Sequence, residues 1–174
     1  LKDVSPVAPI FDIDKLEWMN GVYIRNMSDK KLAGELKPFL PELTEDQIRQ
    51  AVPLIKDRIK RLSEAKELLE FTWHYPEYSS ELLTPKDLSK DTAREMLEKA
   101  KEVIDYRGID KTDALQNELK TLIKNNDWNT GSFFMVFRVA ICAKKITPPI
   151  LESLPLVGKN KVLDRIKLAI TKLH

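Results

Sequence analysis

The chain has 174 residues, of which 43% are hydrophobic and 32% are charged, and its formal net charge is +2. This composition is typical of a folded globular protein and excludes a collagen-like, low-complexity or largely disordered chain. Apolar runs are only a few residues long, far short of the roughly 20 that cross a bilayer, so no membrane segment is predicted. A single cysteine, Cys142, excludes an internal disulfide, and we expect a cytoplasmic location.

Helical signals recur along the chain, beginning with a capping box at Thr44 and Gln47. In such a box the threonine side chain and the glutamine side chain each satisfy a backbone amide at the helix start. Three later segments, 91–108, 110–126 and 158–173, carry apolar residues at helical spacing. The first of them stops at Gly108, the residue type that tolerates a left-handed turn at a helix end. Each of these segments is predicted to be a helix.

No segment alternates apolar and polar residues over five or more positions, so the sequence predicts an all-α fold. The segment "WHYPEYSSELLTPKDL", residues 73–88, is rich in Pro, Ser and aromatic residues and interrupts the helical periodicity. We therefore expect a boundary between two helical subdomains there.

The side chains that carry most enzymatic chemistry are sparse. His74 and His174 lie far apart in the chain, Cys142 stands alone, and the glycines form no phosphate-binding pattern. The apolar neighbours of Cys142 are typical of an inert buried thiol. Neither a metal site nor a catalytic centre is predicted in this chain.

The basic residues are concentrated at the C-terminal end. Residues 138–174 hold 8 Lys and Arg against 2 Asp and Glu, whereas residues 1–137 hold 21 against 25. Such a block can attract phosphate groups, although a solvated helix face would have the same composition. The charge pattern alone leaves both interpretations open.

Three stretches together resemble one known family. They are "FDIDKLEWMNGVYIR" at residues 11–25, "LAGELKPFL" and "AVPLIKDRIKRL" in the first half, and "FRVAICAKKITPPILESLPLVGKNKVLDRIKLAI" from residue 137. In order and spacing they are similar to the anticodon-binding region of bacterial-type glutamyl-tRNA synthetases. The resemblance extends over the whole chain, except that the segment between the two predicted subdomains has little similarity.

The resemblance implies an α-helical anticodon-binding cage of two small bundles. We expect residues 1–27 to form a connecting segment with the first helices, residues 28–82 the first subdomain, and residues 83–174 the second. Neither class I synthetase ATP signature, of the His-Ile-Gly-His or the Lys-Met-Ser-Lys type, occurs here. The chain is thus expected to be a monomeric fragment without cofactor, and its parent to charge tRNA-Glu with ATP and Mg in a catalytic half.

The resemblance also implies which residues bind tRNA. Arg58 matches the arginine that reads the third anticodon base, cytosine, and planar arginine donors can meet a base edge in two places. A second group matches the residues around the first two anticodon bases: Arg138, Thr147, Pro148 and Ile150. A third, basic group is expected to contact phosphates: Lys159, Lys161, Arg165 and Lys167.

The corner at residues 143–150 has its own predicted geometry. A residue before proline favours extended backbone, so Thr147 is expected to cap a helix and to accept from the amide of Ile150. Pro148 and Pro149 would then lie in the first turn and remove two amides, which makes the corner a poor anion site. A rigid apolar edge instead suits unstacked bases. Ala143 stands where the family usually has glycine, so the tightness of this turn is open.

Other functions remain open at this point. The same apolar stripes are compatible with an all-helical protein-interaction module, and a lysyl synthetase of the class with helical anticodon domains is a second alternative. A glutaminyl enzyme is disfavoured, because its β-barrel anticodon domain needs strands that the sequence does not predict.

Overall fold

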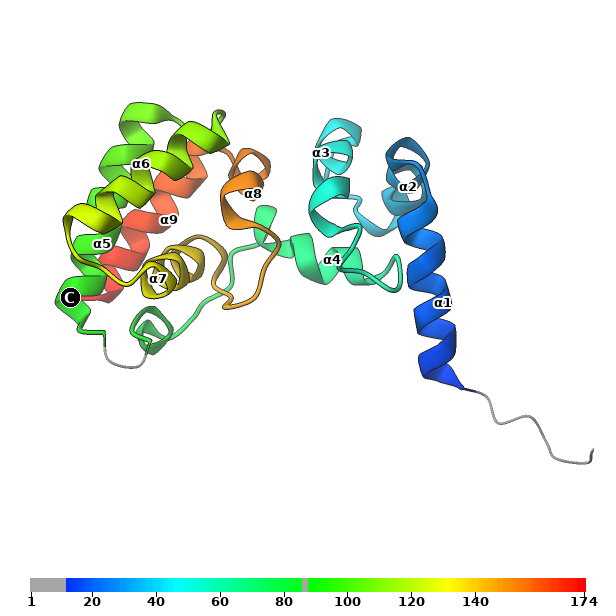
Figure 1. The fold of residues 1–174 in the computed structure, drawn as a ribbon, viewed down its shortest axis with the longest axis horizontal. Coiled ribbons are helices and arrows are strands. Elements are labelled where there is room, and N and C mark those ends of the chain that lie inside the picture. The colour runs from blue at the N-terminus through cyan, green and yellow to red at the C-terminus, as the bar shows by residue number, and fades with distance from the viewer. Residues whose placement is uncertain (1–11, 86–87) are drawn as a thin grey trace, which may run out of the picture.

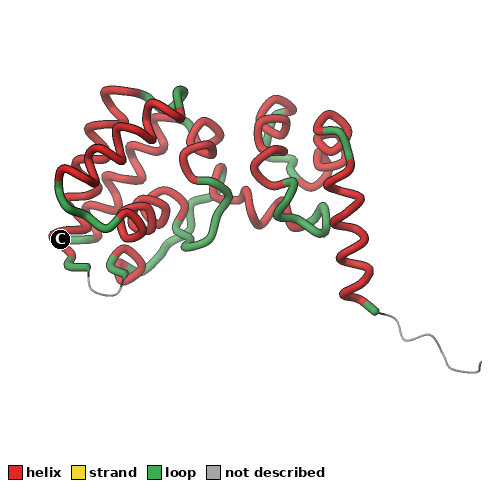
Figure 2. Tube along the Cα trace, viewed as in Figure 1, coloured by secondary structure: helices red, strands yellow, loops and turns green. Residues whose placement is uncertain are grey.

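The computed structural model describes residues 12–85 and 88–174. Phe11 and the rest of segment 1–11, which the sequence assigns to the connecting segment, lie outside the described residues. Every regular element in the described ranges is a helix, with no strand among them, so the predicted all-α fold is confirmed (Figure 2). The α-helices are α1 (Ile13–Asn26), α2 (Asp29–Leu36), α3 (Glu45–Ile55), α4 (Glu64–Leu69), α5 (Lys90–Arg107), α6 (Thr112–Asn125), α7 (Thr130–Cys142), α8 (Ile150–Val157) and α9 (Lys159–Lys172). Short 3₁₀ helices are η1 (Lys37–Phe39), η2 (Glu70–Thr72) and η3 (Ser80–Leu83).

The helices form two groups that lie side by side (Figure 1). Helices α1 to α4 make one group around a core that includes Leu32, Ile48 and Ile55, and helices α5 to α9 make the other. Helix α8 lies between them, and its Leu156 packs into the first core while most of its apolar residues pack into the second. The two-bundle architecture is confirmed, and α8 is the element that joins the bundles.

The break between the two clusters of buried residues lies between Leu69 and Phe71. The segment 73–88 contributes to both cores, because Trp73 packs against the first cluster and Tyr78 belongs to the second. The subdomain limits at residues 27/28 and 82/83 stay a prediction, because burial reports packing and does not define a unit that folds alone.

The helix ends follow local chemistry that the sequence specifies. Thr44 and Gln47 form the predicted capping box at α3, with both reciprocal hydrogen bonds present. Asp12 caps α1 by accepting from the amide of Lys15 at 3.0 Å. Gly108 ends α5 with a φ of 77°, in the region that glycine tolerates. These ends determine where the helices stop and the connecting loops begin.

The turn after α7 places an alanine in a left-handed conformation. Ala143 has φ 56° and ψ 20°, and its amide donates to the carbonyl of Val139 at 2.8 Å. A left-handed residue with a Cβ costs roughly 1 to 2 kcal/mol relative to glycine. The turn is thus tight although a residue with a Cβ occupies it, at an energetic cost. The preceding residue, Cys142, is fully buried, and burial raises its pKa to about 12, as expected for an unreactive thiol.

Replacing Ala143 with glycine is expected to raise the free energy of unfolding by about 0.5 to 1 kcal/mol, because relief of the left-handed strain exceeds the loss of one methyl group and of chain stiffness. Urea denaturation of the chain measures the change. Ala140→Gly, in the interior of the same helix, is the matched control and should destabilise by about 1 kcal/mol. Equal destabilisation by both variants would show that Ala143 is not strained.

Candidate nucleic-acid interface

Arg58 lies in the loop of residues 56–63, between α3 and α4. Its amide donates to the carbonyl of Ile55 at 2.8 Å, and the next residue, Ile59, is fully buried in the first core. The Arg58 side chain is exposed, and within the described ranges its guanidinium donates no hydrogen bond. The backbone is therefore anchored while the five donors of the side chain are available to a ligand.

The second candidate region is the loop of residues 143–149, between α7 and α8. Helix α8 begins at Ile150, and Pro149 is its N-cap residue, with ψ 120°. The Thr147 hydroxyl donates to the carbonyl of Pro148 at 2.8 Å and makes no capping bond. The predicted Thr147 cap is wrong, because it requires helical backbone at Pro148, and a residue followed by proline disfavours that conformation. The helix consequently starts after both prolines.

Several residues assigned to this corner are buried. Thr147 is 7% exposed and Ile150 is 5% exposed in the second core, and Pro148 is also buried. Ile146, which sequence reasoning missed, is 82% exposed and is the large apolar side chain that this loop presents to solvent. The sequence gives no clear signal of this exposure, because Cys142 and Ile150 lie four positions on either side of Ile146, at helical spacing. The apolar edge of the corner is thus carried by Ile146 rather than by Ile150.

Arg138 lies on α7, and its side chain contacts the loop of residues 143–149. Its Nη1 donates to the carbonyl of Lys145 at 3.5 Å, the long limit of a hydrogen bond. Its Nε is buried and has no partner among the described residues. Since Nε is enclosed by protein, a ligand can reach this half-buried guanidinium only through its Nη nitrogens, of which Nη1 makes the one long bond to Lys145.

Arg165 was expected to contact phosphate, and this prediction is wrong. The side chain is 7% exposed, and its Nη1 donates to the carbonyls of Phe71 at 2.7 Å and Ile141 at 2.8 Å. The guanidinium lies 4.5 Å from the ring centroid of Tyr75, and burial lowers the pKa of Arg165. The buried stripe of α9 includes Val162, Ile166 and Ala169, and Arg165 occupies a position within it.

The remaining lysines of α9 differ in availability. Lys161 is exposed. The Lys159 ammonium donates to the carbonyl of Asp105 at 2.7 Å, and Lys167 pairs with Asp164 at 3.2 Å. The basic C-terminal block therefore offers less free charge than its composition indicates.

In the part of the chain that the structure describes, no cluster of His, Cys, Asp and Glu is arranged to hold a metal ion, and no helix there is long and apolar enough to span a bilayer.

The two loops lie on the same edge of the molecule. In the view of Figure 1 the loop between α3 and α4 and the loop between α7 and α8 both lie along the lower edge, with α4 between them. The Lys144 ammonium links the loop between α7 and α8 to α4 and η2. It donates to the carbonyl of Glu67 at 3.0 Å and to the carboxylate of Glu70 at 3.3 Å. The first bundle thus contributes a loop that carries Arg58 to this edge, and the second contributes a loop that Arg138 of α7 contacts at the carbonyl of Lys145.

The profile of one protein family, described as "Anticodon binding domain", matches residues 31–170. The chain belongs to this family. It is 31% identical to a glutamate–tRNA ligase of Dehalococcoides mccartyi over 99% of the chain, and 31% identical to one of Borreliella afzelii over 97%. It spans 38% and 37% of the length of these relatives. The crystal structure of a glutamate tRNA ligase from Elizabethkingia meningosepticum matches 98% of the chain and 34% of its own, with a TM-score of 0.85 at 22% identity.

Membership of the anticodon binding domain family confirms the resemblance predicted from the sequence, and the structural match confirms the fold. An anticodon-binding domain has tRNA as its partner.

Proposed function

We propose that this domain binds the anticodon loop of tRNA-Glu and thereby selects the substrate of a glutamate–tRNA ligase. The observation that carries the proposal is a pair of arginines with unused donors beside two loops at one edge. Arg58 lies in the loop between α3 and α4, and Arg138 lies on α7 and contacts the loop between α7 and α8. Bases of a single-stranded loop are read by donors that meet their exposed edges and by apolar surface against their faces. Arg58 would read the third base, and Arg138 with Ile146 and the backbone of Thr147 and Pro148 would hold the first two.

Phosphate attraction falls to the exposed lysines in this proposal. Lys161 is exposed, and the ion pair of Lys167 is a surface pair that costs little to break. Lys159 can serve only if its bond to Asp105 is exchanged for one to phosphate. Such contacts raise affinity for any RNA and weaken with salt, whereas base contacts decide between anticodons.

Helix α1 supplies a contact to the rest of the enzyme. Ile13, Leu16, Met19 and Tyr23 are exposed and line a groove of about 360 Å³ on this helix. A row of large apolar side chains in water marks a surface that packs against another element. We propose that it packs against the catalytic half of the ligase, which holds ATP and Mg, and that the complete enzyme is a cytoplasmic monomer. The rival, an independent protein-interaction module, would use the same groove.

Binding of tRNA to the full-length ligase tests the proposed function. Affinity is measured for tRNA-Glu and for a transcript that differs only in its three anticodon bases, at two salt concentrations. We expect the altered transcript to bind at least about 100-fold more weakly, since three bases are changed and each well-formed base contact contributes about 1 to 3 kcal/mol. Both affinities should fall with salt by the same factor. Equal affinities would favour the protein-interaction module, and so would a stable protein partner without tRNA binding.

A further inference from the structure

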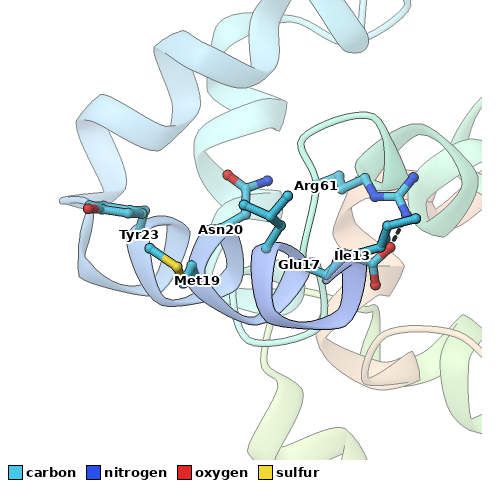
Figure 3. Close-up of a pocket in the computed structure, with 7 residues that line it drawn as sticks. Ile13, Glu17, Met19, Asn20, Tyr23 and Arg61 are labelled. Atoms are coloured by element: carbon cyan, nitrogen blue, oxygen red, sulfur yellow. Dashed lines mark hydrogen bonds and ion pairs between the residues drawn. The ribbon is translucent and has the colours of Figure 1, made fainter. Parts of the chain in front are cut away.

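Side chains of helix α1 bind the loop that carries Arg58 (Figure 3). The Asn20 side-chain amide donates to the carbonyl of Lys60 at 2.8 Å. The Glu17 carboxylate accepts from the Arg61 guanidinium and lies 3.7 Å from the Lys60 ammonium. Glu17 and Asn20 are three positions apart, so they share one side of the helix. These contacts join residues 40 and 44 positions apart in the chain.

A second anchor holds the other side of the loop. The Lys56 ammonium donates to the carbonyl of Met27 at 2.6 Å and to the carboxylate of Asp29 at 2.8 Å. Between the two anchors, Ile59 is fully buried and the side chain of Arg58 projects into solvent. The backbone on both sides of Arg58 is therefore fixed before any ligand arrives.

We propose that Asn20 and Glu17 are positioning residues for Arg58, which hold the loop of residues 56–63 in the conformation that reads the third anticodon base. This inference rests on the proposed function and adds two residues of α1 that do not themselves touch RNA. Fixing the backbone of a residue costs conformational entropy, so a loop that is ordered in advance keeps that part of the binding energy for the base. Without these contacts the loop would have to become ordered on binding, and the entropy cost would reduce the preference for the correct third base.

Asn20 and Glu17 are expected to differ in how strongly each restricts the loop. The bond from Asn20 to Lys60 joins an amide to a carbonyl, and its direction restricts the backbone itself. The contact of Glu17 is an ion pair with exposed partners, and such pairs contribute little and are screened by salt. The hydrogen bond from Arg61 is the main cause that lowers the pKa of Glu17. Removal of Asn20 should therefore have the larger effect, and removal of Glu17 a smaller, salt-dependent one.

The experiment measures third-base discrimination in the full-length ligase, as the ratio of affinities for tRNA-Glu and for a transcript changed only at the third anticodon base. The variants are Asn20→Ala, Arg58→Gln and both together. Asn26→Ala is the matched control, because Asn26 is exposed at the end of the same helix. Hydrogen exchange at the amides of residues 59–61 reports the order of the loop independently of RNA.

We expect Asn20→Ala to lower the ratio roughly 3- to 10-fold, to speed exchange at residues 59–61, and to leave the melting temperature nearly unchanged. The double variant should match Arg58→Gln alone, because a positioning residue has no effect once the residue it positions is gone. Asn26→Ala should behave as wild type.

Two outcomes would overturn the inference and are distinguishable. If Arg58→Gln abolishes discrimination while Asn20→Ala keeps the wild-type ratio, or if the two losses multiply in the double variant, α1 does not position Arg58 and the proposed function stands. If Arg58→Gln itself keeps the wild-type ratio, the assignment of Arg58 fails and the positioning role fails with it.

Discussion

Replacing Arg165 with methionine is expected to lower the free energy of unfolding by about 2 to 4 kcal/mol, the largest stability effect that we predict for a single polar side chain here. The guanidinium satisfies two buried carbonyls, those of Phe71 and Ile141. Methionine fills a similar volume over Tyr75 but leaves both carbonyls unsatisfied, at roughly 1 to 3 kcal/mol each. The loss is partly offset because a buried cation no longer has to be desolvated, the cost that lowers the pKa of Arg165.

The position of Arg165 explains why its replacement lowers the free energy of unfolding. Ile141 lies in the last turn of α7, where carbonyls lack helical partners and carry partial negative charge. Phe71 lies in η2, where the chain passes from the first core to the second. Arg165 therefore ties the connection between the bundles to the second bundle.

Urea denaturation followed by tryptophan fluorescence measures the effect of Arg165→Met. Lys167→Met is the matched control, because Lys167 lies two positions further along the same helix and is exposed. It should change the free energy of unfolding by no more than about 0.5 kcal/mol. If Arg165→Met is as stable as this control, the two carbonyl contacts do not hold the connection.

Local chemistry was enough to predict several helices of this fold. The capping box at Thr44 and the end of α5 at Gly108 depend on residues only a few positions apart, and both occur as predicted. The all-α class followed from periodicity, which reports the direction in which each side chain must face. Boundaries set by nearby residues are therefore readable from one sequence.

The errors arose where a neighbouring or distant residue changed the local preference. Thr147 has the chemistry of a cap, but Pro149 disfavours helical backbone at Pro148 and moves the helix start to Ile150. Arg165 resembles the solvated lysines around it, and only the carbonyls brought close by tertiary packing make its burial favourable. Its position within the stripe of Val162 and Ala169 was the available signal.

The candidate site was predictable in part. The resemblance supplied Arg58 and Arg138, but not their surroundings. The exposure of Ile146, the burial of Ile150 and the contact of Asn20 with Lys60 depend on how separate segments meet, and no local pattern encodes them. For the same reason the charge count overstated the basic surface, since Lys159 and Lys167 already bind acidic neighbours or carbonyl groups.

Arg58→Gln is expected to produce the largest change in recognition. Glutamine keeps a donor but loses the charge and the planar fork that can meet one base edge in two places. Arg58→Lys keeps the charge and loses only the fork, so it separates geometry from electrostatics. We expect both variants to lose about 1 to 3 kcal/mol of discrimination at the third base, and Lys to retain more affinity for any tRNA.

The central claim, that this edge of the domain reads the anticodon, is tested most directly by measuring that discrimination. The full-length ligase, wild type and Arg58→Gln, is titrated with tRNA-Glu and with a transcript altered only at the third anticodon base. We predict that the wild type prefers tRNA-Glu and that the variant loses roughly 5- to 150-fold of this preference, because binding of tRNA-Glu weakens more than binding of the altered transcript. Equal preference in the two proteins would contradict the account.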